Sequence, residues 1–294
     1  MGLTVWSGLT LGSIYALVAL GFLVTLVPTG VFNFAQGALI LGGDYLTYYW
    51  FSSLGLSVGP AIVLDAVVGV MLGILCEVVC IRPLRGRSGR REVGSREIVT
   101  TVGMATGLVG VMGVLWGQAP LSVPFRGSNS VIHWPLGVVA LPVQVIVVVV
   151  AVVAAVGLEI WFRATRMGQA CLAVSEDRTA AMLRGVNVNL LSVCAFGAAG
   201  AMAGLAAYVT GPITYATPAI ANTLALGGFV ALALGGERSF IGAMFAALIV
   251  GVVSSVAAWY LGANYSDPAV LILLLLALGL RPSGVGGRSA VRRV

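Results

Sequence analysis

Four acidic side chains stand within strongly apolar stretches of this 294-residue sequence: Asp44, Asp65, Glu77 and Glu159. An ionisable group is costly to bury in a lipid bilayer, so each is by default a candidate for function if these stretches cross a membrane. Asp44 lies deepest, inside the run 41–45. It is the acidic residue that we assign to a polar path through the protein.

The other three acidic residues have simpler interpretations. Asp65 lies near the outer end of its stretch, where we expect it to be hydrated. Glu77 and Glu159 lie close to arginine clusters, and we expect them to pair with Arg82 and Arg163 at the membrane interface.

Groups for covalent or metal chemistry are scarce. His133 is the only histidine, and no Ser/His/Asp or Cys/His arrangement can be assembled around it, so we expect a solvated residue of an outer loop. Cys76 and Cys80 would share one helix face, while Cys171 and Cys194 have no partner at metal-ligand spacing. Without any lysine the chain cannot form the usual phosphate-binding loop. We expect no catalytic residue, metal or cofactor, and no ATP hydrolysis by this chain.

The composition predicts a protein with several membrane spans. Hydrophobic residues make up 59%, charged residues 9%, and the mean hydropathy is +1.05. Crossing a bilayer takes about twenty apolar residues, and apolar runs of about this length recur throughout. They are residues 3–27, 34–51, 60–81, 98–117, 135–162, 190–211, 222–234, 240–261 and 268–280. We therefore expect one all-helical membrane domain over residues 1–294.

The positive charge indicates orientation and not nucleic-acid binding. All sixteen basic residues are arginines, and most of them fall in the ranges 82–96, 163–184 and 281–293. Arginine-rich loops mark the cytoplasmic side, which places the N-terminus outside and the C-terminal tail inside. Anionic membrane lipid is the expected neighbour of these clusters.

Two junctions, residues 28–37 and 235–242, are too short to be ordinary loops. Paired Gly/Pro interruptions of membrane helices are typical of transport paths, so both are predicted to be helix breaks. In the first, Asn33 and Gln36 would offer neutral amide groups to a path. The alternative at each junction is a tight turn at the membrane surface.

A short polar segment, residues 175–185, separates two long apolar runs. We predict a rod of roughly nine residues and 14 Å, with Ser175 as its N-cap and Glu176 and Asp177 in its first turn. Gly185 would end it after Arg184. Ala180 and Ala181 would give it a face small enough to enter a groove on another protein. An ordinary loop helix is the alternative.

Several ordered motifs together resemble the permease subunits of high-affinity branched-chain amino acid ABC importers. They are LTLGSIYAL at 9–17, VFNFAQG at 31–37, RPLR at 82–85, RMG at 166–168, TAAMLRGVNV at 179–188, GG at 235–236, GA at 242–243 and RPSG at 281–284. The segment from Thr179 is similar to the Glu-Ala-Ala-x-x-x-Gly coupling element of ABC importers, with Thr179 in place of Glu. The likeness covers nearly the whole chain.

The resemblance implies an all-α permease of about eight to nine transmembrane helices in two pseudo-symmetric halves, in the inner membrane of a bacterial cell. It implies a cytoplasmic coupling loop over residues 163–188, in which Glu176, Asp177, Ala180, Ala181, Arg184 and Gly185 form the helix that docks on an ATPase. The implied partners are a second, homologous permease, two cytoplasmic ATPase subunits that bind the ATP, and an external substrate-binding protein.

Departures from the family pattern leave more than one class of transported solute open. The family usually has His where Gln36 stands and commonly a basic residue where Gly228 stands. Urea, short amides and organic acids are therefore alternatives to a branched-chain or other hydrophobic amino acid. A different class, an ion-coupled transporter working alone, would use Asp44 or Asp65 as its proton or sodium site. A membrane-embedded enzyme is the third possibility, but the sequence shows no polar catalytic cluster to support it.

Overall fold

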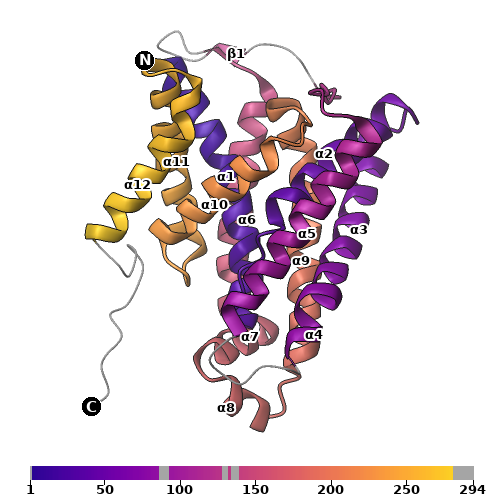
Figure 1. Ribbon diagram of the computed structural model, residues 1–294, viewed down its shortest axis with the longest axis vertical. Coiled ribbons are helices and arrows are strands. Elements are labelled where there is room, and N and C mark those ends of the chain that lie inside the picture. The colour runs from indigo at the N-terminus through magenta and orange to yellow at the C-terminus, as the bar shows by residue number, and fades with distance from the viewer. Residues whose placement is uncertain (1, 86–92, 128–131, 134–138, 281–294) are drawn as a thin grey trace.

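Helices form nearly all of the described chain, because a backbone in lipid has no water with which to hydrogen-bond. The structure is a computed structural model and describes residues 2–85, 93–127, 132–133 and 139–280 (Figure 1). Residues 86–92 of the first arginine cluster, the C-terminal tail and the motif at 281–284 lie outside these residues.

Each of the nine predicted apolar segments corresponds to a helix in the described part of the chain. These helices are α1 (Gly2–Thr29), α2 (Gln36–Ser52), α3 (Val58–Cys76), α5 (Val93–Trp116), α6 (Pro142–Ala164), α9 (Val188–Thr214), α10 (Ile220–Gly235), α11 (Phe240–Tyr260) and α12 (Ser266–Leu280). The helical membrane bundle predicted from hydropathy is confirmed.

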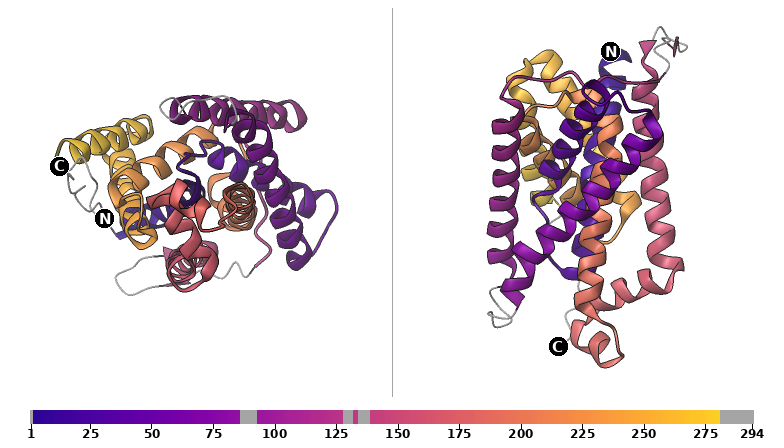
Figure 2. Two further views of the ribbon diagram at one scale, coloured as in Figure 1. Left: turned by 90° about the horizontal axis from the view of Figure 1, so that it is seen from below. Right: turned by 90° about the vertical axis from the view of Figure 1, so that its right-hand side faces the viewer.

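Within the described residues, six helical stretches are long and apolar enough to cross a membrane: α1, α3 with its continuation to Leu84, α5 from Arg96, α6, α9 and α11. Helices α2, α10 and α12 are shorter, at 17, 16 and 15 residues. The bundle seen from its end and its side is shown in Figure 2.

Shorter elements connect the long helices. They are the π-helical turn η1 (Glu77–Ile81), α4 (Arg82–Arg85), α7 (Arg166–Glu176), α8 (Arg178–Leu183), the 3-10 turn η2 (Ala263–Tyr265), and the strands β1 (Ile132–His133) and β2 (Val139–Ala140). The two strands pair antiparallel, so the backbone of His133 belongs to a small hairpin. Helices α4, α7 and α8 lie at one end of the bundle, and the N-terminus and β1 lie at the other (Figure 1). The described arginines of the first two clusters are at the α7–α8 end, as the predicted orientation requires.

Glycine allows two pairs of helices to touch backbone to backbone. In the α1–α11 pair, a Cβ atom on Gly251 would lie 2.2 Å from the backbone nitrogen of Gly12. In the α3–α9 pair, a Cβ atom on Gly200 would lie 2.0 Å from the carbonyl oxygen of Gly69. Small residues replace hydrophobic association as the basis of packing in lipid, because the lipid is as apolar as the side chains.

Gly228 is a buried contact of the same kind. A Cβ atom there would lie 2.5 Å from the Cγ1 atom of Val18 on α1. A basic side chain, which the family commonly has at this position, does not fit the α1–α10 contact of this chain without a rearrangement.

Candidate functional site

The first predicted helix break is present and lies inside the protein. Helix α1 ends at Thr29, α2 begins at Gln36, and the residues between them are not helical. The Oδ1 atom of Asn33 accepts a hydrogen bond from the backbone N–H of Ala35 at 3.2 Å. Asn33 and Gln36 are both fully buried. Their burial rules out the alternative of an exposed turn at the membrane surface.

The break folds back toward the middle of the bundle. A Cβ atom on Gly21 would lie 2.1 Å from Nε2 of Gln36, so the two residues are at the same level. Gly21 comes eight residues before the end of α1, a rise of roughly 12 Å. The Nε2 atom of Gln36 donates to the carbonyl oxygen of Ala199, well inside α9, at 3.1 Å. The start of α2 is therefore held between α1 and α9.

Two amide atoms at the break have no hydrogen-bond partner among the described residues. They are Nδ2 of Asn33 and Oε1 of Gln36. A buried polar atom without a partner costs about 1–3 kcal/mol, so it calls for an explanation. One donor and one acceptor, both neutral, are thus available at the break.

Four phenyl rings surround the break, and the sequence analysis missed them. We call Phe22, Phe32, Phe34 and Phe229 the phenyl cluster. The ring of Phe34 lies 5.9 Å from that of Phe22 and 5.6 Å from that of Phe229, and Phe32 lies 5.9 Å from Phe229, between ring centroids. Phe32, Phe34 and Phe229 are only partly buried. The alternation of Phe32 and Phe34 around Asn33 was the available signal.

Asp44 is fully buried at the contact between α2 and α9, and the hydrogen-bond partner described for it, the hydroxyl of Thr210, carries no charge. Its Oδ1 atom accepts a hydrogen bond from the hydroxyl of Thr210 at 2.7 Å, and its Oδ2 atom has no partner among the described residues. The structure therefore places Asp44 two turns beyond Gln36 on α2, facing α9 as Gln36 does. That it faces a solute path stays a prediction.

The expectation of a hydrated Asp65 is wrong. Asp65 is buried, and its carboxylate accepts hydrogen bonds from the hydroxyl of Thr47 at 2.7 Å and the indole of Trp50 at 2.8 Å. Both donors come from α2, which packs along α3. Position along the apolar stretch could not reveal this pairing, because it depends on how two helices face each other.

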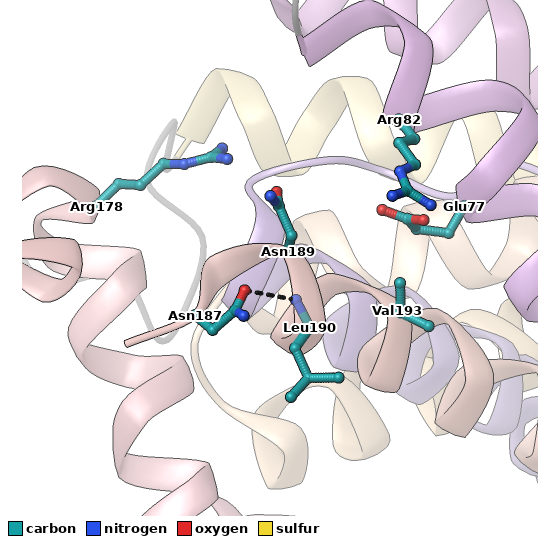
Figure 3. Close-up of a pocket in the computed structure, with 7 residues that line it drawn as sticks. All are labelled: Glu77, Arg82, Arg178, Asn187, Asn189, Leu190 and Val193. Atoms are coloured by element: carbon teal, nitrogen blue, oxygen red, sulfur yellow. Dashed lines mark hydrogen bonds between the residues drawn. The ribbon is translucent and has the colours of Figure 1, made fainter. Parts of the chain in front are cut away.

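A cleft of about 600 Å³ opens beside the arginines at the α8 end of the bundle. It is lined by Glu77, Arg82, Arg178, Asn187, Asn189, Leu190 and Val193. Figure 3 shows Glu77 and Arg82 side by side and Arg178 reaching in from α8. The Oδ1 atom of Asn187 caps α9 by accepting from the N–H of Leu190 at 3.1 Å. The cleft thus separates α8 from the inner end of α3.

The predicted pair of Glu159 and Arg163 is confirmed, with 2.5 Å between Oε1 and Nη2.

The predicted rod over 175–185 is wrong in detail. Ser175 and Glu176 belong to the end of α7, and Ser175 donates to the carbonyl oxygen of Leu172 at 2.7 Å. Asp177 is the N-cap instead, accepting from the N–H groups of Thr179 and Ala180 at 2.8 and 3.0 Å. Helix α8 has only six residues. A carboxylate at the cap favours the start of a new helix and so divides the segment.

The small face proposed for α8 is also corrected. Ala181 is only 4% exposed and packs on the main core, so it is not free to enter a groove. The exposed side chains are those of Met182, at 49%, and Leu183, at 85%. Ala180 is partly buried and Arg184 is exposed. Gly185 ends the helix as predicted, with φ of +87°.

The second predicted break is a turn between α10 and α11. Gly236 has φ of +94°, and the hydroxyl of Ser239 caps α11 by accepting from the N–H of Gly242 at 2.9 Å. Glu237 and Arg238 are exposed. The described residues hold no group of three or more His, Cys, Asp or Glu side chains that could bind a metal ion.

Comparison with known proteins gives consistent matches over nearly the full length. The family model for the branched-chain amino acid transport system permease component matches residues 4–278. The chain is 30% identical to the high-affinity branched-chain amino acid transport system permease protein LivH of Escherichia coli K12, over 98% of this chain and 96% of that protein. It is 31% identical to the corresponding protein BraD of Pseudomonas aeruginosa, with the same coverage. In fold it is similar to a solved structure, PsaBC from Streptococcus pneumoniae in complex with Fab, with a TM-score of 0.52, 14% identity, and coverage of 94% of this chain and 91% of that one.

Substitution of Gln36 separates packing from polarity at the break. We expect Gln36→Ala to lower the free energy of unfolding by about 1–3 kcal/mol, because it leaves a cavity between α1 and α9. Gln36→Leu should change it by less than about 1 kcal/mol, because it fills the volume and removes the unpartnered Oε1. Thermal unfolding of the detergent-solubilised protein, followed by tryptophan fluorescence, measures both.

The same pair of substitutions at the exposed Gln169 of α7 is the matched control, and neither should matter there. An equal loss for Gln36→Leu and Gln36→Ala would show that the hydrogen bond to Ala199, which both variants lose, is the main reason for the glutamine, against our interpretation.

Proposed function

Because the chain belongs to the family of branched-chain amino acid transport permease components, we propose that it is the membrane-embedded permease subunit of an ABC importer. Its solute is a branched-chain or other hydrophobic amino acid. The chain is an integral membrane protein of the helical bundle class, and its relatives are permease subunits and not enzymes.

The break at residues 30–35 is the single observation that best supports a translocation role. Non-helical backbone at membrane depth is tolerated where it is buried in protein or lines a cavity, and it is typical of binding sites in transporters. Here the break combines the partly buried phenyl cluster with the free amide atoms of Asn33 and Gln36. Rings can contact an apolar side chain, and neutral amides can hydrogen-bond a polar head group.

The partners follow from the family and from the exposed end of α8. An importer needs ATPase subunits and a binding protein that delivers the solute; we propose two ATPases, an external binding protein and a second, homologous permease. Leu183 and Met182 form an apolar projection at the cytoplasmic end. An exposed leucine beyond the membrane fits insertion into an ATPase groove. ATP is bound by the partner, and the permease itself needs no cofactor.

An ion-coupled transporter is the alternative that a specific observation favours, since Asp44 and Asp65 are buried carboxylates. An uptake assay distinguishes the importer from the ion-coupled transporter. It uses liposomes that contain the permease and its ATPases, together with the external binding protein. We expect accumulation of leucine to require ATP on the ATPase side and to persist when ionophores collapse the proton and sodium gradients. Uptake by the permease alone, driven by an ion gradient, would contradict the importer.

Leu183 gives a direct test of the docking surface. Leu183→Asp places a charge where an apolar groove would have to bury it, so we expect at least a tenfold weaker association with the ATPase. Co-purification at graded salt and ATP-dependent uptake measure the effect. Ala173→Asp is the control, because Ala173 is exposed on the neighbouring helix α7, and it should leave association unchanged. Equal effects of the two substitutions would exclude Leu183 as an anchor.

A further inference from the structure

Glu159 connects two segments that are far apart in the sequence. From the inner end of α6, its Oε2 atom accepts a hydrogen bond from the backbone N–H of Phe240, the first residue of α11, at 3.0 Å. Its Oε1 atom lies 2.5 Å from Nη2 of Arg163. The bond to Phe240 is buried, whereas the side chain of Arg163 is 72% exposed. The carboxylate therefore has one protein-facing and one water-facing partner.

The position of this carboxylate suits the start of a helix. The first N–H groups of a helix have no partner within the helix, and the helix dipole favours a negative charge at that end. Ser239 takes the N–H of Gly242, and Glu159 takes that of Phe240. The two caps come from different parts of the chain, so α11 begins correctly only when α6 is in place.

Apolar contacts reinforce the same junction. The rings of Phe162 and Phe240 lie 4.7 Å apart between centroids, and both residues are buried. On the other side, Gly168 of α7 packs so closely on α6 that a Cβ atom would lie 2.4 Å from the carbonyl oxygen of Trp161. Helices α6, α7 and the start of α11 therefore form one closely packed unit.

We propose that Glu159 is a positioning residue through which movement of the coupling loop reaches α11. The proposal rests on the proposed function, since it needs an ATPase acting on α8. Helix α8 follows α7 at the Asp177 cap, α7 packs on α6, and Glu159 fixes α6 to α11. Helix α11 contacts the backbone of α1 at Gly12, and α1 holds Gln36 at Gly21. This gives a continuous set of contacts from α8 to the break.

The test uses the complete importer in liposomes and measures leucine moved per ATP hydrolysed. Glu159→Leu keeps volume but removes the acceptor, and we expect this ratio to fall at least fivefold for it and for Glu159→Ala. Glu159→Gln still offers an oxygen to the N–H of Phe240, so it should stay within twofold of the unsubstituted protein. Arg163→Gln removes only the exposed partner and is the matched control, also expected within twofold.

A ratio within twofold for Glu159→Leu, or an equal loss for Arg163→Gln, would overturn the proposal. The amount of assembled complex is measured for every variant, because a purely structural role would reduce that amount without changing the ratio. Failure of both Glu159→Leu and Glu159→Ala to insert would assign the residue to folding alone and also overturn it. If the unsubstituted complex shows no ATP-dependent uptake, it is the proposed function that fails.

Discussion

The need to satisfy every backbone polar group without water is the constraint on which the structure depends. Regular helices meet it along most of the described chain, and between Thr29 and Gln36 the chain leaves the helix inside the bundle. There the protein itself must supply the partners. Asn33 closes a turn on the N–H of Ala35, and Gln36 holds onto α9. Two amide atoms still lack partners in the described part of the chain, which is the pattern expected where stability is given up for function.

Such a break can be enclosed only if the surrounding helices approach closely. Glycine contacts between α1 and α11 and between α3 and α9 bring backbones together on both sides of it. A helix pair that is joined by backbone contact moves as a unit, because side chains cannot rearrange between its members. Movement of α6 and α11 would therefore shift α1 and alter the space beside it. The fold links α8 to a buried break, and residues 30–36 of that break include no charged side chain.

Hydropathy predicted all nine long helices, since an apolar run of this length has few other stable structures. The short junction with glycine and proline located the buried break at residues 30–35, whereas the second junction is a turn between α10 and α11. The predictions that were wrong concern side chains whose partners lie on other helices of the folded protein. Asp65 finds its donors on α2, and Ala181 turns toward the core because Asp177 starts a separate helix. The bond from Phe240 to Glu159 joins residues 81 positions apart, which no local pattern could indicate.

We propose that the buried break lies on the solute path and opens during transport. Reaction of a cysteine at position 36 with a small water-soluble thiol reagent tests it most directly, in the assembled importer with and without ATP. Gln36 is fully buried here, so the account predicts no reaction at rest and rapid reaction during turnover. A Gln36→Cys importer that still moves solute, while the thiol stays unreactive throughout turnover, would contradict it.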